Sequence, residues 1–487
     1  MADYDLVIRN GTVATAADTM ICDIGVKDGI IATLGRNLGP GSREIDATGR
    51  YVLPGGIDSH CHIEQRSSAG VICADDFYSA TVAAAFGGTT TVIPFAAQHR
   101  GQSLRRVVEE YHQAAAPKAV IDYAFHLIIS DPTEQVMGQE LPALIRDGYT
   151  SFKIYMTYDL LRLDDRQILD ILAVARREGA FVMVHAENHE MIKWLTDRLL
   201  DRGLGAPRYH AVSHARLAEG EATNRAVTLS ELLDVPILLV HVSAAEAIAV
   251  IRNAQTRGLK IYGETCPQYL FLTADDIAKP GLEGAKFCCS PPPRDRAAQE
   301  AVWTGLRNGT FQVFSSDHAP YRFDASGKLP KGDKTTFKEI ANGVPGIELR
   351  LPLLFSEGVG QGRLDINAFV ALTATNHAKL YGLYPRKGTI AVGSDADIAI
   401  WDRERETPIT AGMLHDNVGY TPYEGRCVRG WPVTVISRGR IVVEDGNLAA
   451  ARGSGAFLPC GLPEAARPLG MAAPELAFVA QTGSALV

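Results

Sequence analysis

Two histidines separated by one residue, His60 and His62, follow the short apolar stretch "GGID". Side chains alternate between the two faces of a strand, so residues i and i+2 point to the same side. Two imidazoles that converge in this way are a frequent arrangement for holding a metal ion. A pair of hydrogen-bonded, chemically inert histidines at a strand end is the alternative, because a short motif alone does not decide between the two.

Four further polar residues lie within or directly after apolar stretches, and they are Lys153, His185, His241 and Asp317. Imidazole and carboxylate ligands suit zinc, and less often manganese, iron, cobalt or nickel. The four histidines and one aspartate exceed the roughly four ligands of a single tetrahedral zinc shell. We therefore predict two divalent metal ions that share a bridging ligand, with zinc as the favoured metal.

Lys153 needs a separate explanation, because an ammonium group cannot bind a cation and would repel one nearby. Burial beside two divalent ions favours the uncharged form of a lysine. A neutral lysine amine can add carbon dioxide to become a carbamate, whose two oxygens can bridge two metals. The alternative is a salt-bridged lysine, or one whose ammonium reaches solvent at the rim of the fold.

These residues need a scaffold that brings distant strand ends together. The middle of the chain alternates strand-like and helical stretches, such as the helix predicted over residues 165–179, which is typical of a parallel α/β domain. Eight strands are predicted, at residues 55–63, 89–95, 121–129, 149–156, 181–187, 236–243, 260–266 and 313–320. This succession favours a closed (β/α)8 barrel of the TIM type, with catalytic groups at the carboxyl ends of the strands. An open doubly wound sheet is the alternative, but no G-x-G-x-x-G follows the first strand.

Both flanks of this middle region carry signals of short antiparallel strands. Residues 1–53 contain Asn-Gly, Asp-Gly and Thr-Gly turn signals between apolar stretches, and the stretches 388–402 and 433–446 have a similar texture. We therefore predict an α/β protein with a barrel over residues 54–385 and a β-sandwich domain built from residues 1–53 and 386–450.

Composition narrows the class of protein. The formal net charge of −8 argues against nucleic acid and anionic membrane surfaces as partners. The first residues lack the apolar core of a signal peptide, and no stretch approaches the roughly 18 apolar residues of a membrane span. The eight cysteines are scattered, which is typical of reduced thiols in a cytoplasmic protein. Residues 451–487, rich in Ala, Gly and Pro, are expected to form a C-terminal extension that is disordered or lies along a partner.

The motifs that carry most of this information are "GGIDSHCHIE", "SFKIYMTY", "VHAEN", "LLVHVSA", "ETCPQYLFL", "CSPPPR", "SSDHAP" and "NGVPGIELR". Together they resemble the cyclic-amide hydrolases of the amidohydrolase superfamily, and within it the dihydropyrimidinase and D-hydantoinase family. The resemblance covers residues 1 to about 450. It implies a (β/α)8 barrel with a sandwich from both chain ends, a two-metal centre bridged by a carboxylated lysine, and a homotetramer.

The resemblance also implies a complete set of metal ligands, in which a carbamate on Lys153 bridges the two ions. It divides the other ligands between the more buried and the more exposed ion, as His60, His62 and Asp317 for the former and His185 and His241 for the latter.

Three more residues obtain roles from the resemblance. Tyr158 matches the tyrosine that stabilises the oxyanion, and Ser290 and Asn342 match positions whose backbones hold the ring amide. The implied reaction is attack of a metal-bridging hydroxide on the ring carbonyl, with Asp317 as general base and then general acid. The expected small-molecule substrates are dihydropyrimidines or 5-substituted hydantoins, and the products are N-carbamoyl amino acids.

The chain departs from the family pattern at residues 64–77, "EQRSSAGVICADDF", which are polar where hydantoinases of aromatic or aliphatic preference have a largely apolar substrate gate. This disfavours 5-phenylhydantoin, and it leaves Arg66 facing either an anionic ring substituent or solvent. Another cyclic amidase, such as an allantoinase or an imidase, is an alternative function. A non-catalytic assembly protein of the same fold, like the collapsin response mediator proteins, is disfavoured because all six ligand positions are present.

Overall fold

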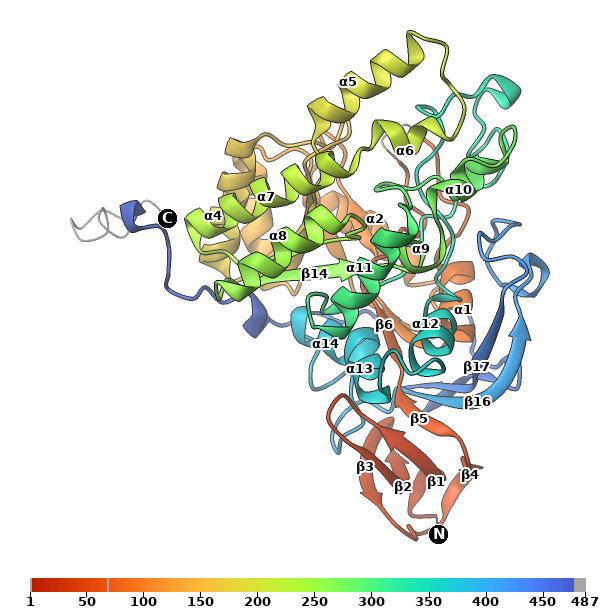
Figure 1. Ribbon diagram of the computed structural model, residues 1–487. Coiled ribbons are helices and arrows are strands. Elements are labelled where there is room, and N and C mark those ends of the chain that lie inside the picture. Colours follow the sequence, from red (N-terminus) through yellow and green to blue (C-terminus); the bar gives the residue numbers. More distant parts are fainter. Residues whose placement is uncertain (1, 68–69, 477–487) are drawn as a thin grey trace.

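A ring of parallel strands surrounded by helices forms the centre of the computed structural model, which describes residues 2–67 and 70–476 (Figure 1). Each predicted barrel stretch contains at least one strand, which confirms the α/β barrel. The barrel strands are β6 (Gly56–Asp58), β7 (Thr89–Val92), β8 (Phe95–Ala97), β9 (Asp122–Tyr123), β10 (His126–Ile128), β11 (Ser151–Tyr155), β12 (Phe181–His185), β13 (Ile237–Leu239), β14 (Ile261–Thr265) and β15 (Val313–Phe314).

The ring consists of two parallel sheets, with the strand orders β6-β7-β9 and β15-β14-β13-β12-β11-β10-β8. Short breaks at residues 93–94 and 124–125 separate β7 from β8 and β9 from β10, so that these strands continue from one sheet into the other. Cys61 and His318 form a parallel bridge between the segments that follow β6 and β15. The His62 N–H donates to the His318 carbonyl at 2.7 Å, so the first and last strand ends are joined.

Helices cover the outside of the ring, and α4 shows how the sequence specifies one of them (Figure 1). Asp164 and Gln167 form a capping box at its start, and Gly179 ends it in the left-handed region, as predicted for residues 165–179. Within the described ranges, no helix combines the length and apolar character needed to cross a membrane. The α-helices are α1 (Phe77–Phe86), α2 (Leu104–Ala115), α3 (Leu141–Arg146), α4 (Asp165–Glu178), α5 (His189–Leu200), α6 (Tyr209–Ser213), α7 (Arg216–Leu233), α8 (Ala245–Thr256), α9 (Gln268–Phe271), α10 (Ala274–Ile277), α11 (Arg296–Arg307), α12 (Arg350–Leu354), α13 (Ile366–Val370) and α14 (Asn376–Leu380).

The two ends of the chain meet in a nine-stranded, mostly antiparallel sheet, in which β5 joins the N-terminal strands to β16. Its buried face packs around Ile8, Ile24, Val52, Ile398 and Ile436. The strands are β1 (Tyr4–Ala14), β2 (Thr19–Lys27), β3 (Ile30–Gly35), β4 (Gly41–Asp46), β5 (Tyr51–Pro54), β16 (Ile398–Pro408), β17 (Cys427–Ser437), β18 (Arg440–Glu444) and β19 (Asn447–Leu448).

Two local predictions for this sheet are wrong. Asn10 and Gly11 do not form a turn, because Asn10 adopts a φ of 62° inside the continuous strand β1 and its N–H donates to Asp23, which leaves a bulge. Residues 388–397 form turns instead of the start of a strand. Asp395 keeps one isolated bridge to Ile30, and the carboxylates of Asp395 and Asp397 turn to the buried ammonium of Lys387, at 3.0 and 2.6 Å, which holds this segment as a loop.

The described part of the C-terminal extension runs along the amino ends of the barrel strands. Its backbone N–H groups donate to carbonyls of the chain just before or within these strands, such as Leu458 to Tyr123 at 2.7 Å and Cys460 to Gly148 at 3.0 Å. Further along, the Asp234 carboxylate accepts from the N–H groups of residues 469–471. The alternative that the extension is disordered is therefore wrong for residues 451–476, which lie along the barrel of their own chain, and residues 477–487 lie outside the described part.

We expect the extension to stabilise the barrel. Leu458 is fully buried against the amino ends of the strands. Leu458→Ala should lower the free energy of unfolding by about 2–5 kcal/mol, the usual cost of such a cavity. Leu469→Ala is the matched control, because Leu469 lies in the same segment and is 39% exposed. Urea unfolding of both variants measures the difference, and equal midpoints would show that the extension does not pack as described.

Candidate active site

All six predicted ligands come from the carboxyl ends of barrel strands or the residues just after them. Lys153 lies in β11 and His185 ends β12, whereas the others follow β6, β13 and β15, and these are His60, His62, His241 and Asp317. The structure brings them together in one buried space, where each is buried except for the slightly more accessible His62. Strand alternation and the barrel therefore position the groups as the sequence indicates.

Three of these residues form a cluster that could hold a metal ion. One ligand atom from each of His60, His62 and Asp317 lies within 4.8 Å of the others. The Asp317 Oδ1 atom is 3.1 Å from His60 Nε2 and 3.5 Å from His62 Nε2. Burial would raise the pKa of Asp317, but the charges and hydrogen bonds of the two histidines hold it well below its ordinary range. Two imidazoles and an ionised carboxylate are a suitable donor set for a divalent metal.

His185 and His241 form the other side of the site. Their ring centroids are 4.4 Å apart, and the His241 ring is 5.4 Å from that of His60. Burial lowers the pKa of both residues, which keeps the imidazoles neutral. The neutral form is the one that can bind a metal, so these two residues fit a second ion beside the first.

Lys153 lies beside the first of these two groups. Its Nζ atom is 2.9 Å from His60 Nε2 and lies 4.5 Å from the centre of the Phe95 ring. Burial lowers the pKa of Lys153 to about 8. None of the salt bridges in the described part of the chain involves Lys153, so the salt-bridged alternative is not observed there.

The backbone is unusual at three predicted site residues. Tyr158, His241 and Asp317 have φ values of 72°, 41° and 48°, in the left-handed region that residues other than glycine seldom adopt. Such conformations cost about 1–3 kcal/mol each and persist only where the surroundings hold them. All three follow directly after barrel strands, so the strained turns aim their side chains into the site.

Three residues that orient the histidines were not identified from the sequence. Glu264 Oε1 lies 2.5 Å from His60 Nδ1, Glu187 Oε2 lies 2.8 Å from His185 Nε2, and Gln65 Oε1 lies 2.7 Å from His62 Nδ1. For His60 and His62 the acceptor holds Nδ1, while Nε2 faces Asp317 and remains for a metal. Glu187 fixes the ring of His185 in the same manner. For Glu264 the sequence did contain a signal, namely an acidic residue inside a strand predicted to be buried. Glutamate is seldom buried without a partner, so this position indicated one.

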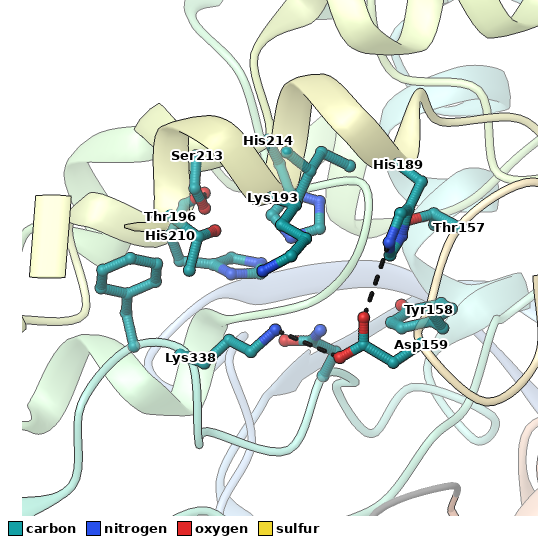
Figure 2. Close-up of a pocket in the computed structure, with 13 residues that line it drawn as sticks. Thr157, Tyr158, Asp159, His189, Lys193, Thr196, His210, Ser213, His214 and Lys338 are labelled. Atoms are coloured by element: carbon teal, nitrogen blue, oxygen red, sulfur yellow. Dashed lines mark hydrogen bonds and ion pairs between the residues drawn. The ribbon is translucent and has the colours of Figure 1, made fainter. Parts of the chain in front are cut away.

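A cavity of about 100 Å³ is lined by His189, His210 and His214 and by none of the six predicted ligands (Figure 2). Two of the three predicted substrate-binding residues, Tyr158 and Asn342, belong to its lining, and the Tyr158 ring lies 5.2 Å from that of His185. Burial raises the pKa of Tyr158, while hydrogen bonding with the side chains of Ser290 and Asn342 opposes the rise. The tyrosine therefore stays protonated at neutral pH. Asp159 lies at the edge of this cavity, 3.5 Å from both His189 and Lys338.

The polar stretch after His62 is engaged mainly within the protein. Glu64 pairs with Lys118 at 2.7 Å, Gln65 contacts His62, and the Ser67 hydroxyl accepts from the Val71 N–H. Arg66 is exposed. The expectation that the polarity of this loop selects the substrate therefore depends on Arg66 alone among these four residues. Ser68 lies outside the described residues.

Comparisons with known proteins identify the family of the chain. The chain matches the amidohydrolase family over residues 51–442. It is 44% identical to a D-hydantoinase of Rhizobium radiobacter, over 93% of this chain and 98% of the relative. It is 46% identical to a D-hydantoinase of Geobacillus stearothermophilus, over 93% of this chain and 96% of the relative. The solved structure of a dihydropyrimidinase from Brevibacillus agri NCHU1002 has a TM-score of 0.91 and 43% identity, covering 95% of this chain and 99% of that one.

Gln65 offers a direct test of the residues that orient the histidines. Gln65→Leu removes the acceptor of His62 Nδ1, and we expect the affinity for a divalent metal to fall roughly 10- to 100-fold. Competition with a chelator of known affinity measures this for zinc and cobalt. Ser67→Ala is the control for disturbance of the same loop and should leave the affinity unchanged. Equal affinities for Gln65→Leu and the unmodified protein would remove Gln65 from the metal site.

Proposed function

Because the chain belongs to the amidohydrolase family, as a metal-dependent hydrolase of cyclic amides, we propose that it opens dihydropyrimidine or 5-substituted hydantoin rings to N-carbamoyl amino acids. The observation that carries this proposal is the buried cluster of His60, His62 and Asp317, with Lys153 Nζ 2.9 Å from His60 Nε2. The relatives do not favour an allantoinase, an imidase or a non-catalytic assembly protein.

We assign the ligands of two divalent ions, with zinc favoured, to the six buried groups. His60, His62 and Asp317 would hold one ion, and His185 and His241 the other. The two ions, when bound, would supply Lewis acidity to the ring carbonyl and to water.

Lys153 would bridge the two ions as a carbamate. Its amine nitrogen forms a bond to the carbon of CO₂, and the proton that the amine loses goes to solvent. The product is a carbamate anion with two oxygens, whereas the side chain of an unmodified, protonated lysine is a cation. The contact with His60 Nε2 supports this assignment, because an ammonium there would compete with a metal for the imidazole nitrogen.

The remaining steps belong to residues of the chain. Asp317 takes a proton from the attacking water as the new C–O bond forms at the ring carbonyl. Tyr158 remains protonated through its raised pKa and donates a hydrogen bond to the oxygen that becomes negative. The ring C–N bond then breaks, and Asp317 returns the proton to the leaving nitrogen. The backbones at Ser290 and Asn342 hold the ring amide.

We also propose a cytoplasmic homotetramer. The family resemblance supports the tetramer, and the eight cysteines, all of which are free, are consistent with a reducing compartment. The domain limits remain part of the proposal, with the barrel over residues 54–385, the sandwich from residues 1–53 and 386–450, and the extension over residues 451–487.

Ring opening by the zinc-loaded protein tests the proposed function. The panel consists of dihydrouracil, hydantoin, 5-phenylhydantoin, 5-carboxymethylhydantoin and allantoin, with metal content measured on the same sample. We expect turnover of dihydrouracil or hydantoin with about two metals per chain. A metal-loaded protein that opens none of these rings would contradict the substrate assignment.

Tyr158→Phe tests the role of the hydroxyl. Loss of one donor to the oxyanion should lower kcat by about 10²- to 10³-fold and leave the metal content unchanged. Tyr155→Phe is the matched control, because Tyr155 is also buried and stacks on His185 through its ring, which phenylalanine retains. A kcat for Tyr158→Phe equal to that of the control would exclude Tyr158 from the mechanism.

A further inference from the structure

Lys328 is fully buried, yet its ammonium contacts main-chain carbonyls and no carboxylate within the described part of the chain. The Nζ atom donates to the carbonyls of Cys288 and Ala341 at 2.8 Å and of Gly343 at 2.6 Å. An ammonium has three donors and no acceptor, so this geometry uses all of its hydrogen-bonding capacity. Burial lowers the pKa of Lys328 to about 8.

A buried charge without a counter-ion is costly, so the arrangement needs a compensating role. Anchoring its own loop does not require the charge, because backbone bonds already close that loop. The Lys328 N–H donates to Arg322 at 2.8 Å and the Gly327 N–H to Asp324 at 3.1 Å. The ammonium instead joins two other segments of the chain.

These two segments are the ones that carry the proposed substrate-binding residues. Cys288 lies two residues before Ser290, while Ala341 and Gly343 flank Asn342 on both sides. The Gly343 N–H also donates to the Cys288 carbonyl at 3.0 Å, which links the segments directly.

Asn342 is held beside the catalytic tyrosine by this close packing. A Cβ atom at Gly343 would lie 2.3 Å from the Ala319 Cβ, so no larger residue fits there. Asn342 and Tyr158 line the same cavity, and the Asn342 Oδ1 atom is buried without a partner in the described structure.

We propose that Lys328 is a positioning residue whose ammonium ties the segments 288–290 and 341–343 into one rigid cradle for the ring amide. The inference rests on the proposed function, because Ser290 and Asn342 obtain their roles there. Since the cradle holds the ring in the ground state and the transition state alike, its loss should act on KM more than on kcat.

Lys328→Met keeps the length of the side chain and removes the charge. We expect KM for the best substrate of the panel to rise roughly 10- to 100-fold, with a smaller change in kcat and an unchanged metal content. Lys331→Met is the matched control, because Lys331 lies in the same loop, is exposed and pairs with Glu339. An unchanged KM for Lys328→Met would overturn the proposal.

Chemical rescue separates the charge from simple packing. Lys328→Ala leaves space for propylammonium, which should restore KM in part, whereas 1-propanol should not. Equal effects of the two compounds would show that the site needs filling and not a cation, and would overturn the proposal. This variant also serves if Lys328→Met does not fold.

Hydrogen exchange without substrate provides a readout that does not depend on turnover. Peptides over residues 286–292 and 339–345 should exchange faster in Lys328→Met than in the unmodified protein and in Lys331→Met. If the unmodified protein opens no ring, the proposed function fails, but faster exchange in both segments would still support the tie. Unchanged exchange in both segments would overturn it.

Discussion

The buried contact of His60 with Lys153 and Asp317 is the interaction on which the rest of the structure depends. His60 Nε2 lies 2.9 Å from Lys153 Nζ and 3.1 Å from Asp317 Oδ1, although the three residues come from β11 and from the segments after β6 and β15. Groups of this polarity are costly to bury unless other groups compensate them. Glu264 does so from behind, 2.5 Å from His60 Nδ1, and closure of the ring brings the first and last strand ends into contact.

Three sets of contacts hold the site residues in place. Acceptors such as Glu264 and Gln65 fix the histidine rings from the side that faces away from Asp317. Lys328 joins the two loops beside Tyr158 by their carbonyls. The C-terminal extension packs Leu458 against the amino ends of the strands, at the opposite end of the barrel. These contacts hold residues whose backbone is strained, such as Asp317 with its φ of 48°, at the carboxyl ends of the strands.

The barrel and the groups at its strand ends could be predicted from the sequence because both follow from local pattern. Strand alternation places His60 and His62 on one side, and the strand–helix succession brings Lys153 and the others to the same face. Contacts that depend on tertiary structure could not be predicted. In the sequence, Gln65 is one of several polar residues of a loop, whereas in the structure it lies 2.7 Å from His62. Lys328 could not be identified because it binds main-chain carbonyls, which every residue has. The packing of the extension could not be predicted either. Backbone hydrogen bonds hold it to the barrel, and such bonds leave no periodic side-chain pattern in the sequence.

Anomalous diffraction from crystals of the zinc-loaded protein, grown with bicarbonate, would show whether two metals and a carbamate occupy the site. We expect two zinc peaks roughly 3.5–4 Å apart, one beside His60, His62 and Asp317 and one beside His185 and His241. We also expect electron density for a carboxyl group on Lys153 Nζ between the two peaks. A single peak, or two peaks beside an unmodified Lys153, would contradict the two-metal site with a bridging carbamate.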